Sequence, residues 1–208
     1  MLKMRSAVSR DTAGHLVPAG LKKRIGAFGI DYLPIAAYLA ALTGVAAALR
    51  RTPLRDWLGR VYSNPYTAQL ADSLAFDLPV MAYFALFEAS PWEATPGKRR
   101  LGLRVVTIAG GRVSLPQAAA RIALKFLPWE IAHTSLWHTP GWPRHSRPTA
   151  ANYASYALVY ALAGAYVITL LTSDTRQAFY DRLTHTRVVL APHDKTHTKS
   201  GRAIESAG

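Results

Sequence analysis

Residues 22–48 read KKRIGAFGIDYLPIAAYLAALTGVAAA, and three cations stand directly before a run in which Asp31 is the only charge. As an α-helix this run is roughly 36 Å long, enough to cross a hydrocarbon core of about 30 Å with some tilt. Between Ile35 and Ala48 almost nothing gives water a polar face. The stretch therefore predicts a transmembrane helix that carries one acid, and Pro34 can kink it near that acid.

Three further segments extend this pattern into a bundle. Residues 71–89 are mostly apolar, and residues 152–172 contain no charge. Residues 117–138 mix charged and apolar side chains, which fits either a kinked span or an interfacial amphipathic helix. We predict an all-α integral membrane helical bundle of about four transmembrane helices, the third either spanning or interfacial, at about 25–49, 71–89, 117–138 and 152–172. Small residues that recur every fourth position on the first and last spans suit close helix contacts, including those of a homo-oligomer.

The segment between the second and third spans predicts a short cytoplasmic β-hairpin. Leu103, Val105 and Thr107 alternate along one strand, Gly110-Gly111 supplies the turn, and residues 112–114 return. The flanking cations are expected to face the anionic headgroups of the cytoplasmic leaflet. They are Lys98, Arg99, Arg100 and Arg104.

Composition excludes several function classes. The formal net charge is +13, but the cations flank the apolar runs, which is the positive-inside pattern and not a nucleic-acid-binding patch. Cysteine is absent, so disulfides and thiolate chemistry are excluded. No cleavable signal is evident, so the first span is expected to stay in place as a signal-anchor. Residues 1–20 and 192–208 are expected to be cytoplasmic tails.

Three landmarks occur together in the chain: RIGAFGID at residues 24–31, TPGKRRLGLRVV followed by Arg121, and QAFYDRLTHTRVV after the last span. This arrangement resembles the RDD family of small bacterial membrane proteins. The resemblance covers roughly residues 21–191 and matches the family's arginine to Arg24 and its aspartates to Asp31 and Asp181. His185 stands where a small residue is common in the family. The resemblance implies a multi-pass protein of the bacterial inner membrane, and transport, including sodium/proton exchange, has been proposed for some members.

Two interpretations of the matched residues stay open. Arg24 and Asp31 are about 10 Å apart along one helix, so Arg24 is expected to pair with Asp181 instead. Asp31 either handles a proton or cation or serves as a hydrogen-bonded structural group. Asp77 is a second intramembrane acid, which could extend a relay from Asp31 or lie in a hydrated vestibule.

Other motifs carry little. TPGKRR lacks the first glycine and the hydroxyl residue of a phosphate-binding loop. The pairs His133/His138 and His193/His197 have spacings a metal could use but lack a third ligand, so no metal and no cofactor are expected. Nothing predicts an enzyme. We expect either a bundle that moves a monovalent cation or proton, or a non-transporting adaptor whose basic hairpin binds lipid or a protein partner.

Overall fold

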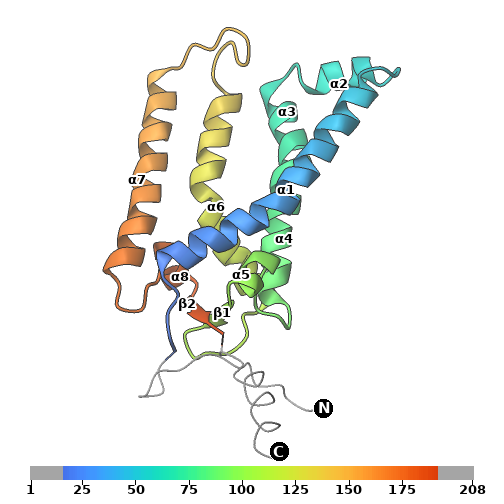
Figure 1. Cartoon of the computed structure of the whole chain (residues 1–208). Coiled ribbons are helices and arrows are strands. Elements are labelled where there is room, and N and C mark those ends of the chain that lie inside the picture. The colour runs from blue at the N-terminus through green and yellow to red at the C-terminus, as the bar shows by residue number, and fades with distance from the viewer. Residues whose placement is uncertain (1–15, 192–208) are drawn as a thin grey trace, which may run out of the picture.

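The computed structural model describes residues 16–191, which form a sheaf of long helices with a small sheet at one end (Figure 1). The helix from Pro65 to Ala89 is continuous but contains a π-helical turn. The long helices are α1 (Leu21–Leu49), α3 (Pro65–Asp72) continued by η1 (Ser73–Asp77) and α4 (Leu78–Ala89), α6 (Leu115–Trp137) and α7 (Ala150–Thr172). They cover the four segments expected from the sequence.

The short elements lie at the two ends of the sheaf. At one end, which we call the sheet end, are α5 (Pro96–Arg100), β1 (Leu103–Thr107), α8 (Phe179–Leu183) and β2 (Thr186–Leu190). The other end carries α2 (Arg55–Val61) and the α6–α7 connection.

The predicted hairpin is wrong in its second strand. β1 pairs antiparallel with β2, from Leu103 opposite Leu190 to Thr107 opposite Thr186. Residues 112–114 contribute only one isolated bridge, between Val106 and Arg112. The physical reason is that Ser114 caps α6, its side chain accepting a hydrogen bond from the backbone of Gln117 at 3.3 Å, so the chain turns into a helix there.

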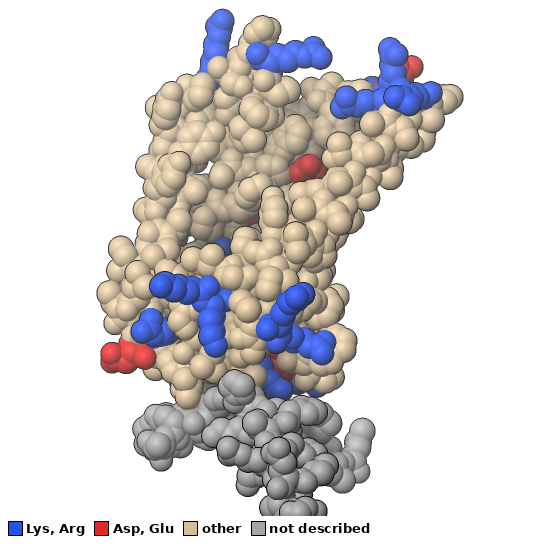
Figure 2. Space-filling model, viewed as in Figure 1, with Lys and Arg blue, Asp and Glu red and all other residues tan. Residues whose placement is uncertain are grey.

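Among residues 16–191, three helices are long and apolar enough to cross a membrane: α1, the Pro65–Ala89 helix and α7. Large apolar side chains on them are exposed in the isolated chain, as at Leu33, Tyr160 and Ile168. Figure 2 shows Lys and Arg gathered at both ends of the molecule, with a broad, nearly uncharged belt between them. Such a belt matches the hydrocarbon region of a bilayer.

Helix α6 packs between α4 and α7 and is as long as α7, but it falls outside those three apolar helices. Its sequence carries Arg121, Lys125 and Glu130. These charged side chains take part in the contacts within the bundle that are described below. That α6 is a fourth membrane crossing stays a prediction.

Tyrosines join the helices where prolines interrupt them. Pro79 has no N–H to offer the carbonyl of Ala75, four residues earlier, and the hydroxyl of Tyr38 on α1 donates to that oxygen instead. Pro128 likewise frees the carbonyl of Leu124, which accepts from the hydroxyl of Tyr166 on α7 at 2.6 Å. Each proline thus exposes an acceptor that ties its helix to a neighbour.

Candidate functional site

The centre of the sheet end is a buried guanidinium, Arg121 on α6, which is 2% exposed. Its Nε and Nη2 donate to one oxygen of Asp181 at 3.0 and 2.8 Å, and its Nη1 donates to Glu88 at 2.6 Å. The planar fork of arginine suits two carboxylates in this way better than an ammonium would. Arg121 therefore ties the end of α4 to α8.

Arg24 on α1 joins the same network from the other side. Its Nη1 lies 2.8 Å from the second oxygen of Asp181, and its Nε and Nη2 donate to the carbonyls of Ala19 and Arg176 at 3.2 and 2.6 Å. Asp181 also accepts from the backbone N–H of Ala178 at the start of α8. The head of α1 is thereby fastened to the segment that follows α7.

Lys98 completes the network and corrects an expectation from the sequence. It does not face lipid headgroups: it is 8% exposed, and its ammonium donates to Glu88. Burial lowers the pKa of Lys98, and the Glu88 carboxylate opposes part of that change. The other expected basic residues lie nearer the surface. Arg99 stacks over the Trp92 ring at 4.7 Å, Arg100 is exposed, and Arg104 lies 3.5 Å from Glu93.

Asp31 is 1% exposed and accepts three hydrogen bonds. Tyr83 donates its hydroxyl at 3.0 Å, Thr95 its hydroxyl at 2.5 Å and Gly97 its backbone N–H at 2.8 Å. Thr95 is also the N-cap of α5. The carboxylate of α1 therefore holds the start of α5, a placement that suits a negative charge.

Gly97 is required by this contact. A Cβ built there would lie 2.1 Å from the carbonyl oxygen of Ala27 and 2.8 Å from the Cγ of Asp31. The glycine lets the backbone of α5 rest directly on α1. The TPGKRR segment is thus a helix-docking motif, and its glycine serves close approach.

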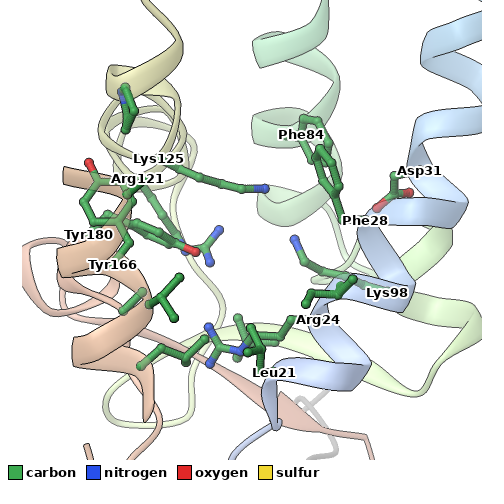
Figure 3. Close-up of a pocket in the computed structure, with 17 residues that line it drawn as sticks. Leu21, Arg24, Phe28, Asp31, Phe84, Lys98, Arg121, Lys125, Tyr166 and Tyr180 are labelled. Atoms are coloured by element: carbon green, nitrogen blue, oxygen red, sulfur yellow. The ribbon is translucent and has the colours of Figure 1, made fainter. Parts of the chain in front are cut away.

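A cavity of about 560 Å³ opens between these elements, lined by residues of α1, α6 and α7 and floored by the sheet end. Its wall is mostly apolar, with Phe28, Phe84 and Leu170 among its residues. Its charged lining comes from Arg24, Asp31, Lys98, Arg121 and Lys125. Figure 3 shows these side chains converging from both sides of the cavity.

Lys125 is a cation of the cavity wall that takes no part in the ionic network. It extends from α6 into the cavity toward Phe84 (Figure 3), with its Nζ 4.6 Å from the centre of that ring and 5.2 Å from Phe28. Within residues 16–191, no carboxylate or carbonyl accepts a hydrogen bond from this ammonium. The aromatic faces attract it but satisfy none of its three N–H donors.

The structure therefore brings Arg24 and Asp181 together as an ion pair. Asp31 has other partners but lines the same cavity as Arg24, whereas Asp77 lies apart from that cavity. The sequence did not single out Glu88, Arg121 or Lys125 as site residues. The available signal was that Glu88 is a charge at the end of a long apolar helix and that Arg121 and Lys125 stand among apolar residues of a long helix, where a charge is costly unless partnered. His193 and His197 lie outside the described residues.

These features define a multi-helix membrane protein with a buried ionic network at one end. The sequence model of the RDD family matches residues 18–185, most of the chain. The chain belongs to the RDD family, as its resemblance indicated. No curated protein and no solved structure matches it.

Proposed function

We propose that this RDD protein binds an anionic amphiphile, a lipid with a singly charged phosphodiester headgroup, in the cavity between α1, α6 and α7. The observation that carries the proposal is Lys125, an ammonium at the wall of an apolar cavity with no hydrogen-bond acceptor in the described part of the chain.

Charge supports an anionic ligand. Arg24, Lys98, Arg121 and Lys125 line the cavity, and Asp31, Glu88 and Asp181 are the carboxylates beside them. Four cations face three carboxylates, an excess of one positive charge in a region where an unbalanced ion is costly. One phosphodiester would balance it and accept hydrogen bonds from Lys125.

The position of the cavity supports a lipid over a soluble anion. α1 packs mainly on α5, whereas α7 packs on α6 and α8, so the cavity lies where these two apolar helices diverge (Figure 1). A lipid could place its headgroup at Lys125 and its chains along the apolar wall.

The test compares the wild type with Lys125→Met in nanodiscs that contain phosphatidylglycerol or phosphatidylcholine. Bound lipid is counted by native mass spectrometry, and thermal midpoints are recorded with and without inorganic phosphate. Lys23→Met is the matched control, because it removes an exposed lysine at the same end of the molecule.

We expect phosphatidylglycerol to be retained by the wild type and by Lys23→Met, and lost roughly tenfold from Lys125→Met, a loss of about 1.4 kcal/mol in binding. Equal retention of phosphatidylcholine would show that the headgroup charge is not recognised. Stabilisation by inorganic phosphate alone would assign the site to a soluble anion. Retention by a folded Lys125→Met protein would contradict the proposal.

Cation or proton transport is the second candidate, and the observation that favours it is that Asp31 lines the same cavity. Proton and sodium flux in proteoliposomes tests it, with Asp31→Asn compared at verified folding. Flux lost in Asp31→Asn would favour transport, and no flux in the wild type across several cations would reject it. A non-transporting adaptor would instead lose its binding to lipid or to a protein partner when Arg99 and Arg100 are neutralised.

The proposal includes the setting. We take α6 as the fourth crossing, with its charges facing the network, and both termini on the cytoplasmic side of a bacterial inner membrane. The family membership supports this setting, and four crossings would leave both termini on the same side of the membrane. A homo-oligomer would cover the exposed apolar faces further.

A further inference from the structure

A second cluster of ionisable side chains lies in the bundle away from the cavity. Asp72 and Asp77 on the second long helix face His133 on α6, and one ligand atom from each residue lies within 4.8 Å of the others. His133 Nε2 is 3.2 Å from an oxygen of Asp72, and its Nδ1 is 3.4 Å from Oδ2 of Asp77. None of the three lines the cavity at Lys125.

The π-helical turn builds this cluster. In a regular α-helix, residues five apart point about 140° away from each other around the axis. The π-turn Ser73–Asp77 widens the helix by one residue, so that Asp72 and Asp77 both reach α6. Single π-turns of this kind often occur at functional sites.

The cluster has unsatisfied polar atoms. Asp77 is 5% exposed, and Trp129 donates to its Oδ1 at 3.0 Å. Within residues 16–191 its Oδ2 has no hydrogen-bond partner, and neither does Nδ1 of His133, whose Nε2 accepts from the indole N–H of Trp137 at 3.2 Å. Buried polar atoms without partners are rare and call for an explanation. Oδ2 and Nδ1 face each other, so the missing partner belongs between or beside them.

Charge points to a cation. Glu130 precedes His133 by one helical turn, interacts electrostatically with Asp77 and His133, and also has a buried oxygen without a hydrogen bond. The helix Pro65–Ala89 has no lysine or arginine. Among the described residues, neither lysine nor arginine pairs with Asp72, Asp77 or Glu130. Three carboxylates thus share one imidazole, and their full ionisation would leave a large uncompensated charge in the bundle.

We propose that Asp72, Asp77 and His133, with Glu130 beside them, bind a divalent first-row transition-metal cation. Imidazole with carboxylates suits Zn²⁺ and Mn²⁺, whereas Ca²⁺ and Mg²⁺ prefer oxygen ligands alone. In a tetrahedral site with metal–ligand distances of about 2.0–2.2 Å, the ligand atoms lie roughly 3.3–3.6 Å from one another. Nδ1 of His133 and Oδ2 of Asp77 are already 3.4 Å apart, and rotation of the Asp72 side chain would bring a third ligand to the metal.

The sequence paired His133 with His138 and found no third ligand. The structure gives His138 a different neighbour, since its Nε2 lies 3.0 Å from Oε1 of Gln69. The two carboxylates that face His133 come from the Pro65–Ala89 helix. The π-turn of that helix brings them close enough together to bind one metal ion with His133.

The experiment uses the full chain without a polyhistidine tag, purified in detergent and dialysed against micromolar Zn²⁺ or Mn²⁺. Bound metal is measured by mass spectrometry of the elements, affinity by calorimetric titration, and the thermal midpoint with and without metal. Wild type is compared with Asp77→Asn and His133→Gln. The matched controls are Asp56→Asn and His145→Gln, which change exposed residues of the same types.

We expect one metal per chain in the wild type and in both controls, and a higher thermal midpoint when it is bound. Asp77→Asn and His133→Gln should weaken binding by roughly tenfold or more. Wild-type protein that is folded and retains neither metal would overturn the proposal. Equal binding in the wild type and in His133→Gln would also overturn it, because the metal would then lie elsewhere on the chain. If Asp77→Asn does not fold, Glu130→Gln and the wild-type measurement still decide.

Discussion

Arg121→Gln is the most informative perturbation of the buried network, because one side chain joins two carboxylates from different elements. The change removes three hydrogen bonds, two to Asp181 and one to Glu88. Lys98 and Arg24 remain to pair with these two carboxylates. Removing one partner from a buried ion pair costs about 3–5 kcal/mol, and the remaining cations place this case near the lower end, at about 3 kcal/mol.

The assay is thermal unfolding in one detergent, followed by the circular dichroism of the helices. For a chain of this size, about 3 kcal/mol corresponds to a midpoint lowered by roughly 6–12 °C. Arg182→Gln is the control, because Arg182 is exposed on the same short helix as Asp181 and should change the midpoint little. Glu88→Gln combined with Arg121→Gln should cost less than the two single changes added together.

A midpoint that falls by less than about 2 °C in Arg121→Gln would refute this reasoning. It would mean that the network contributes little to the stability of the sheet end. Simple additivity in the double variant would refute the direct coupling of Glu88 and Arg121.

Two further changes test the helix contacts. Gly97→Ala places a Cβ 2.1 Å from the carbonyl oxygen of Ala27, so we expect it to lower the free energy of unfolding by about 1–3 kcal/mol, measured by thermal unfolding. In the control Gly29→Ala, the new Cβ meets nothing within 4 Å and should be tolerated. Equal stability of the two variants would contradict the close approach of α5 to α1. Tyr166→Phe leaves the carbonyl of Leu124 without its donor, which should lower the free energy of unfolding by about 1–3 kcal/mol. Adding Pro128→Ala should restore much of this stability, because it returns the helical hydrogen bond to that carbonyl. A Tyr166→Phe protein as stable as the wild type would show that the hydroxyl is not needed.

Several elements follow from local sequence. The apolar lengths of α1 and α7 depend on residues that are neighbours in the chain. The same holds for the strand β2, whose residues Thr186–Leu190 read as strand-like. The partner of β1 did not follow, because the turn at Gly110-Gly111 suggested a local return while the buried face of β2 supplied a better one.

The site divides along the same line. Lys98 was expected at the surface because it stands in a basic run, yet Glu88 draws it inside. The role of Asp31 in transport stays a prediction. What the structure adds is that its carboxylate accepts three hydrogen bonds. Which charges pair could not be read from spacing, because 33 residues separate Glu88 from Arg121 and 157 separate Arg24 from Asp181.

The sequence by itself determined that this is a helical membrane protein of the RDD family, since apolar length and flanking charge are local properties measured against a bilayer of fixed thickness. Only the tertiary structure decided which ionisable groups meet. The rotation of each helix about its axis sets those meetings, and a single π-turn or a proline changes it. The network at Arg121, the unpaired ammonium of Lys125 and the cluster at His133 all depend on such rotations.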